Sequence, residues 1–195
     1  YFANRFKDSK FFIAKAFGLG ILICFPAGYL NTYVLQTFTN NNPVNNALLV
    51  GFFAGGLVEE LLKFFALLFY LPTQKKLKKF DIVIFALFIS LGFAVYENFG
   101  YVFNPSGASF EIAFLRAFTA VPMHIFNGII MGYFFEFYSK TGDNKFLGYT
   151  VLLPIILHGS YNFFVSENLL IAKGIILLQV FLAYRLKTMY DNNIR

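Results

Sequence analysis

Six long apolar segments follow one another along nearly the whole chain. A transmembrane helix needs about 20 predominantly apolar residues. Inside hydrocarbon only helices and closed barrels satisfy all their backbone hydrogen-bonding groups. We place the spans at about residues 11–37, 45–71, 81–103, 110–138, 146–165 and 168–187. The sequence therefore predicts an all-α fold: a polytopic membrane protein built as a bundle of about six transmembrane helices.

The composition agrees with a membrane setting. The chain is 58% hydrophobic and only 13% charged, whereas soluble domains carry about 25% charged residues. The connecting segments are short, so we predict one transmembrane domain over residues 1–195 and no soluble domain. The single cysteine, Cys24, excludes an internal disulfide and a cysteine-based metal cluster. Because the chain starts with Tyr1, we expect its native start to lie further upstream.

Basic and non-basic connections alternate along the predicted spans. Lys and Arg occur in the N-terminal segment, in PTQKKLKKFD, in SKTGDNK and in the C-terminal tail, but not in TNNNPVNN, NPSGAS or SEN. By the positive-inside rule, both termini are then cytoplasmic. The net charge of +6 is explained by this orientation and by contact with anionic lipid of the bilayer. We therefore predict no nucleic-acid partner.

Ionisable residues interrupt four neighbouring apolar spans. A charged side chain at the centre of a bilayer costs roughly 2.5–3.5 kcal/mol on the insertion scale, and such residues usually mark functional sites. We predict that these side chains face one another across a polar cavity and carry out chemistry there. They are Glu59, Glu60 and Lys63 in the second span, Glu97 in the third, Arg116 and His124 in the fourth, and His158 in the fifth.

The two adjacent glutamates of the second span can take different roles. Glu59 and Lys63 are four residues apart, so they share a helix face and can form an ion pair. Glu60 points about 100° away from Glu59 on a helix. One carboxylate would then be paired with Lys63 and the other would face the cavity as a general base or acid. The alternative is a salt bridge that only holds helices together.

The remaining candidates are spread over three spans. His158 and Asn162 are four residues apart in HGSYN, so an imidazole and an amide face the same volume. The two histidines of the chain, His124 and His158, both lie within predicted spans. Glu97 is followed by Asn98, and Arg116 either offsets Glu97 or reaches the membrane interface. Counted along the spans, the set occupies the middle and the extracytoplasmic part of the bilayer.

These motifs, taken in order, resemble the PrsW family of bacterial intramembrane proteases. The resemblance rests on EELLK, GFAVYEN, Arg116 with His124, and HGSYN, and covers about residues 45–165. It extends distantly to the CAAX-prenyl proteases and the bacteriocin-processing (ABI) proteins. Lys63 stands where the CAAX branch uses Arg one residue later, which argues against a prenylated substrate. The resemblance implies regulated proteolysis in the bacterial cytoplasmic membrane: a single-pass substrate, an anti-sigma factor, would be cut on its extracytoplasmic side.

Two mechanisms fit this set of residues. In the metal-free mechanism, Glu60 or Glu59 with His124 activates a water, while His158 and Asn162 stabilise the oxyanion. In the metal mechanism, His124, His158 and Glu97 hold Zn²⁺, and a remaining glutamate is the base. We expect either no cofactor or zinc, and favour the glutamate-type mechanism because Asn is a poor zinc ligand.

A different class of function is open at this stage. Intramembrane Glu and His residues also form proton relays, as in a proton- or cation-coupled transporter. Transporter folds are often built from inverted repeats, with sites at the repeat interface. This chain has no detectable internal repeat, and its ionisable residues fall in one cluster of spans. The sequence therefore favours a protease over a transporter.

Overall fold

The computed structural model describes residues 10–73, 77–103, 110–165 and 167–193, and most of these residues are helical. No strand occurs within these ranges, so the all-α prediction is confirmed. The helices are α2 (Lys10–Phe38), α3 (Pro43–Leu48), the π-helix η1 (Leu49–Glu59), α4 (Glu60–Tyr70), the short 3₁₀ turn η2 (Leu71–Thr73), α5 (Asp81–Phe103), α6 (Phe110–Phe118), α7 (Ala120–Thr141), α8 (Asn144–Val165) and α9 (Leu169–Asn193).

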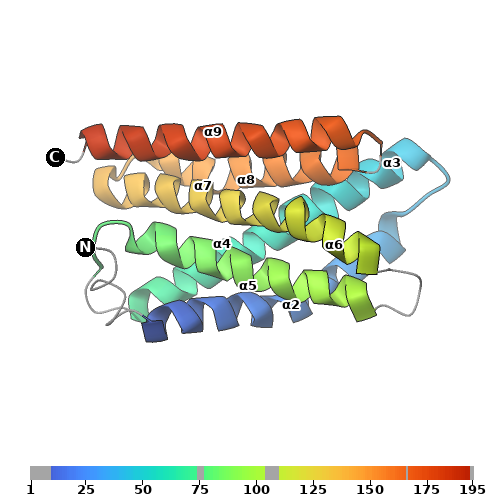
Figure 1. The fold of residues 1–195 in the computed structure, drawn as a ribbon, viewed down its shortest axis with the longest axis horizontal. Helices are drawn as coiled ribbons and strands as arrows, with labels where there is room; N and C mark the ends of the chain where they lie inside the picture. Colours follow the sequence, from blue (N-terminus) through green and yellow to red (C-terminus); the bar gives the residue numbers. More distant parts are fainter. Residues whose placement is uncertain (1–9, 74–76, 104–109, 166, 194–195) are drawn as a thin grey trace.

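The long helices run lengthwise in one bundle (Figure 1). α5 packs against both α2 and α7, while α8 packs against η1 and α7. α9 covers α7 and α8 along the other side of the bundle. The helices that carry the predicted motifs are thus the central ones, and α2 and α9 flank them.

Within the described residues, four helices are long and apolar enough to cross a membrane: Lys10–Phe38, Asp81–Phe103, Phe110–Thr141 and Leu169–Asn192. The other two predicted spans are also helical. The second forms α3, η1 and α4 in succession, and the fifth forms the 22-residue α8. In Figure 1 the segment of α3, η1 and α4 crosses the bundle obliquely, whereas α8 lies along it. Each of the six predicted spans is thus largely helical over its described residues.

The fourth predicted span is broken into two helices. α6 ends at Phe118 and α7 begins at Ala120, because Thr119 has the non-helical angles φ −126° and ψ −68°. The break lies at Thr119, three residues before Pro122. Pro122 instead occupies the first turn of α7, where its missing N–H leaves no helical bond unmade.

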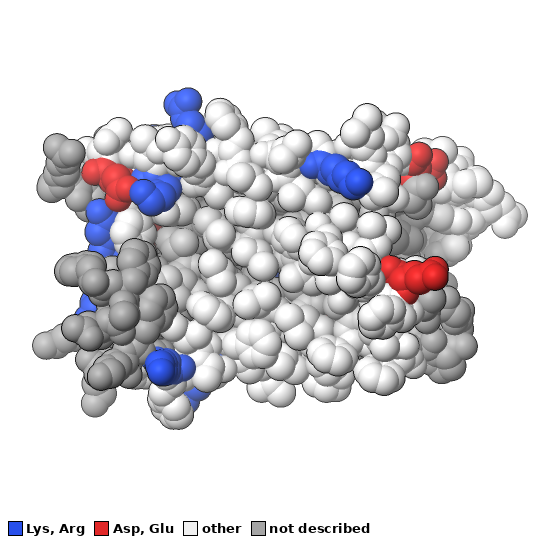
Figure 2. Space-filling view, in the orientation of Figure 1, with Lys and Arg blue, Asp and Glu red and all other residues white. Residues whose placement is uncertain are grey.

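Charge is distributed unevenly along the bundle. α2 begins and α9 ends at the same end of the molecule (Figure 1), and Figure 2 shows most of the visible Lys and Arg side chains there. Lys173, near the start of α9, departs from this pattern. The pattern agrees with both termini on one side of the membrane. Several positions used in that prediction lie outside the described residues: Arg5, Lys7, Lys75, Lys76, Arg195 and the segment 104–109.

Glycines bring η1 and α8 into close contact. A β-carbon at Gly51 would lie 2.8 Å from the carbonyl oxygen of Gly159, and one at Gly56 would lie 2.9 Å from that of Ile155. Gly51 and Gly56 therefore allow the two helices to pack closely. A β-carbon at Gly55 would instead meet the side chains of Asn162 and His158, so this glycine also makes room for the candidate site.

The crossing of α2 and α5 gives a first testable prediction. A β-carbon at Gly20 would overlap the backbone carbonyl of Ile89, whereas one at Gly18, half a turn away, meets nothing. We expect Gly20→Ala to lower the free energy of unfolding by about 1–3 kcal/mol, as overpacking does. Gly18→Ala should be neutral or slightly stabilising, because Ala favours a helix over Gly. Unfolding in mixed micelles measures both, and equal stabilities of the two variants would contradict the close crossing.

Candidate active site

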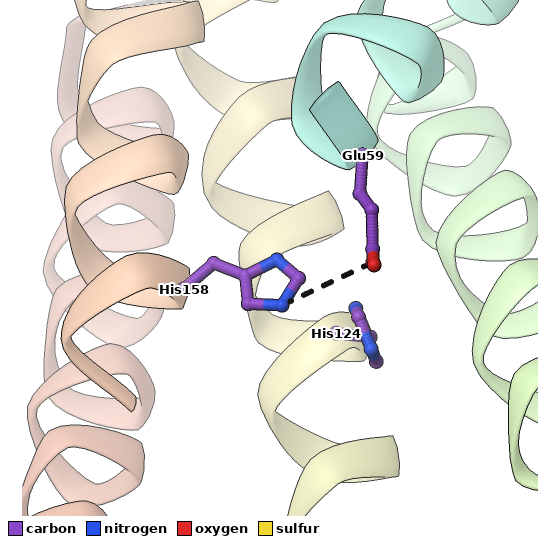
Figure 3. A group of neighbouring side chains, drawn as sticks. All are labelled: Glu59, His124 and His158. Carbon is purple, nitrogen blue, oxygen red and sulfur yellow. Dashed lines mark ion pairs between the residues drawn. The ribbon is translucent and has the colours of Figure 1, made fainter. Parts of the chain in front are cut away.

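Five ionisable side chains meet in the interior of the bundle. They are Glu59 at the end of η1, Glu60 and Lys63 in α4, His124 in α7 and His158 in α8, and none is more than 6% exposed. In Figure 3 the two imidazoles and the carboxylate of Glu59 point toward one another from three segments. The predicted convergence of these residues from separate spans is what the structure shows.

Glu60 is held by two partners. Its Oε1 lies 2.8 Å from Nζ of Lys63 and 2.7 Å from Nδ1 of His158. Since a carboxylate can only accept, we infer that Nδ1 of His158 carries the proton. The other ring nitrogen, Nε2, is then an acceptor, and it lies 3.1 Å from Nδ2 of Asn162.

Lys63 pairs with Glu59, as expected, but it pairs more closely with Glu60. Nζ of Lys63 is 4.0 Å from Oε2 of Glu59 but 2.8 Å from Oε1 of Glu60. Residues three apart are helix neighbours as well as residues four apart. Glu60 has no exposed surface, whereas Glu59 is slightly exposed. The charge of Glu60 therefore gains more from a close ion pair than the charge of Glu59 does.

Glu59 keeps one oxygen available. Its Oε1 accepts a hydrogen bond of 3.1 Å from Nδ2 of Asn31 on α2. Its Oε2 lies 3.9 Å from Nε2 of His158 and, in the part of the chain that the structure describes, has no hydrogen-bond partner. Both glutamates have such an oxygen, since Oε2 of Glu60 also has no hydrogen-bond partner among the described residues, but only Glu59 has a carboxylate oxygen grouped with both histidines there.

His124 connects this cluster to a second ion pair. Its Nδ1 lies 2.8 Å from Nζ of Lys63, and its Nε2 lies 3.0 Å from Oε2 of Glu97. The other oxygen of Glu97 is 2.8 Å from Nη2 of Arg116, whose guanidinium lies over the ring of Tyr101. Arg116 thus offsets Glu97, the first of the two alternatives.

Asn98 lies apart from these residues. Its side chain donates a 3.0 Å hydrogen bond to the carbonyl of Ala113 and so connects α5 to α6. The supporting role that the sequence suggested for Asn98 is, in this structure, a contact between helices.

The sequence analysis missed three sets of polar residues. Asn31 was one, since a neutral amide in an apolar span is a weaker signal than a charge. Near the histidines, Gln179 donates to Asn127, and Asn127 donates to the carbonyl of Pro154. This bridge joins α9, α7 and α8 close to His124 and His158. Nearer the basic end, Glu136 accepts a 2.6 Å hydrogen bond from Tyr190.

Some of these groups have the composition of a metal site. Ligand atoms of Glu59, His124 and His158 all lie within 4.8 Å of one another. The third member is Glu59, not Glu97 as the sequence analysis proposed. Two imidazoles and a carboxylate are a known ligand set of catalytic zinc. Glu60 and Glu97 contact the other nitrogens, as carboxylates around metal-bound histidines do.

The types of these residues and their spacing fit a divalent cation, but one contact of His124 must break before a cation can bind. Of the two nitrogens of His124, Nδ1 faces Lys63 and Nε2 faces Glu97. His124 can bind a cation only after one of these partners moves. The ammonium of Lys63 is the partner that repels a cation.

The chain is similar to known proteins over most of its length. A family model described as PrsW family intramembrane metalloprotease matches residues 9–186. The chain is 32% identical to Protease PrsW of Oceanobacillus iheyensis over all of this chain and 90% of that protein. It is 33% identical to Protease PrsW of Clostridioides difficile over 79% of this chain and 65% of the relative. It is 32% identical to Protease PrsW of Bacillus subtilis over 79% of this chain and 69% of that protein. No solved structure matches.

Proposed function

The chain belongs to the PrsW family of intramembrane proteases, and from that membership we propose that it cuts a single-pass membrane protein through a glutamate-activated water. Its multi-pass bundle places it in a bacterial cell membrane, as predicted. Membership of this family supports a protease, and not the transporter that the sequence had left open as an alternative. The observation that carries the mechanism is the carboxylate of Glu59, buried, with one oxygen directed at two buried histidines.

The water would be activated between Glu59 and His158. Oε2 of Glu59 would accept one proton of the water. Nε2 of His158, an acceptor while Nδ1 donates to Glu60, would accept the other hydrogen bond once Asn162, its partner in this structure, turns toward the oxyanion. The water oxygen then bonds to the scissile carbonyl carbon, and the carbonyl electrons move to its oxygen. When the C–N bond breaks, the proton held by Glu59 passes to the leaving nitrogen.

The oxyanion would be stabilised by Asn162. We expected His158 to share this role, but with its proton on Nδ1 the free nitrogen cannot donate a hydrogen bond. The amide of Asn162, next to that nitrogen, can donate to a developing negative charge. Glu60 and Lys63 would then hold His158 and His124 in place.

We propose an anti-sigma factor as the substrate, cut on its extracytoplasmic side. The position of the site along the bundle supports that side. Glu97 and His158 lie beyond the middle of α5 and α8 when counted from the basic end. His124 lies in the second turn of α7, also away from the basic end. Water and a peptide segment would reach these residues most directly from the side opposite the basic loops.

Mapping the cut tests this proposal. The chain would be expressed with a panel of single-pass membrane proteins, anti-sigma factors included, each carrying a reporter on the extracytoplasmic side. Mass spectrometry of the released fragments gives the bond that was cut. We expect new ends at or just outside the extracytoplasmic end of the span. Ends on the cytoplasmic side would contradict the proposed side, and an uncut panel would contradict the proposed activity.

A zinc-dependent form of the same reaction is the second candidate, favoured by the grouping of Glu59, His124 and His158. These three residues would hold the ion, which would supply a Lewis acid and an activated water. The carboxylates of Glu60 and Glu97 would keep both imidazoles oriented through their second nitrogens. Lys63 would have to withdraw from His124 to admit the ion.

A further inference from the structure

Helix α2 reaches the candidate active site through Asn31. This residue lies in the second half of α2, outside every motif that the sequence analysis singled out. Its Nδ2 donates a 3.1 Å hydrogen bond to Oε1 of Glu59. Because only the amide nitrogen can donate to a carboxylate, this contact fixes which way the amide is turned.

The other atom of this amide is unused. Oδ1 of Asn31 is buried and, among the residues that the structure describes, has no hydrogen-bond partner. Buried polar atoms are nearly always hydrogen-bonded, and an exception needs an explanation. Here the atom belongs to a side chain that already touches Glu59, so a substrate bound beside Glu59 could supply the missing donor.

We propose that Asn31 is a positioning residue with two contacts: its Nδ2 orients Glu59, and its Oδ1 accepts a backbone N–H of the substrate next to the scissile bond. This inference rests on the proposed function of Glu59 as the base. A peptide that is opened for cleavage inside a membrane loses its own helical hydrogen bonds and must find partners in the protein. Asn31 provides an acceptor for such a peptide at the wall formed by α2.

The contact with Glu59 decides which carboxylate oxygen is free. With Oε1 held by Asn31, Oε2 is the oxygen near Nε2 of His158, at 3.9 Å, and near Nζ of Lys63, at 4.0 Å. Without Asn31 the carboxylate can rotate and pair more closely with Lys63, which would occupy the oxygen that must accept a proton. Loss of Asn31 should therefore lower kcat even when the helices stay packed.

Two substitutions separate the two contacts. Asn31→Asp keeps an acceptor at the position of Oδ1 but removes the donor to Glu59, whereas Asn31→Ala removes both. The matched control is Thr32→Ala, on the next residue of α2, whose exposed hydroxyl donates to the carbonyl of Gly28 within its own helix. The probe is whichever single-pass reporter protein the unchanged chain cuts, with kcat and KM measured in lipid nanodiscs.

We expect kcat to fall about 10- to 100-fold in both Asn31 variants, the loss expected for a hydrogen bond to a charged group. KM should rise for Asn31→Ala and stay near that of the unchanged chain for Asn31→Asp. Asn31→Gln, which keeps the amide, should recover part of kcat. Values of kcat equal to that of Thr32→Ala in both variants would overturn the proposal, as would a loss of kcat that only follows a loss of folded protein.

Glu59→Gln separates this inference from the proposed function. If Glu59→Gln cuts the reporter normally, the proposed base is wrong and the role of Asn31 is overturned with it. If Glu59→Gln is inactive while both Asn31 variants behave as Thr32→Ala does, the base stands and only the positioning role is wrong. A reporter panel that stays uncut by the unchanged chain counts against both.

Discussion

Replacing Glu59 by Gln should lower kcat by about 10²–10⁴-fold, the usual contribution of a positioned general base. Gln is nearly the same size as Glu and can still accept the hydrogen bond from Asn31. It cannot take a proton from water, so the chemical step should fail while the bundle stays folded. The measurement is the single-turnover rate of reporter cleavage, with folding checked by resistance to unfolding in mixed micelles.

Two other glutamates serve as comparisons. Glu111→Gln changes an exposed carboxyl on α6 and should leave cleavage unaltered. Glu60→Gln should also reduce cleavage, because it replaces the charged acceptor that keeps the proton of His158 on Nδ1 by a neutral amide, which accepts more weakly. Its effect should be smaller than that of Glu59→Gln if Glu60 only orients the histidine. The reverse order would assign the base to Glu60, and full activity of Glu59→Gln would remove it from the mechanism.

Replacing Lys63 by Met should produce the largest loss of stability. Lys63 is 1% exposed and Glu60 is fully buried, and their ion pair is 2.8 Å long. Removing one partner of a buried ion pair leaves the other charge without compensation and typically costs about 3–5 kcal/mol. We expect Lys63→Met to lower the free energy of unfolding by about this amount, and to lower cleavage because His124 loses the donor to its Nδ1.

The double variant Glu60→Gln with Lys63→Met separates the charge from the packing. With both charges gone, most of the lost stability should return, although cleavage should not. A double variant that is as unstable as Lys63→Met alone would show that Lys63 acts by its volume and not by its charge. Lys145→Met, which removes an exposed pair with Asp143, is the matched control and should change stability little.

The fold could be predicted from the sequence because apolar length and the sorting of basic loops act along the chain. The helices α5, α8 and α9 fall close to the predicted spans for this reason. The break at Thr119 could not be predicted, since Pro122 is the stronger local signal. The π-helical form of η1 also had no signal, because it accompanies the close packing of Gly51 and Gly56 against α8.

The residues that form the candidate site could be predicted for a related reason. A charged residue inside an apolar span must find a partner there, so Glu60, Lys63 and His124 could be expected to meet. Their individual pairings depend on distances between helices, which spacing along one helix does not give. The sequence therefore predicted the pair of Lys63 and Glu59 but not the closer pair of Lys63 and Glu60. It also placed Glu97 near the histidines, where Glu97 contacts His124, but did not group Glu59 with both imidazoles. Asn31 carries no charge and could be found only from its contact with Glu59.

The metal content of the purified, active chain tests the central claim most directly, when it is paired with reporter cleavage in the presence and absence of a chelator. The glutamate mechanism uses Glu59, His158 and Lys63 as they lie in the structure, so it predicts that metal-free protein still cuts the reporter at its full rate. About one zinc per chain, with activity lost on chelation and restored by zinc, would contradict it. That result would make Glu59, His124 and His158 the metal ligands.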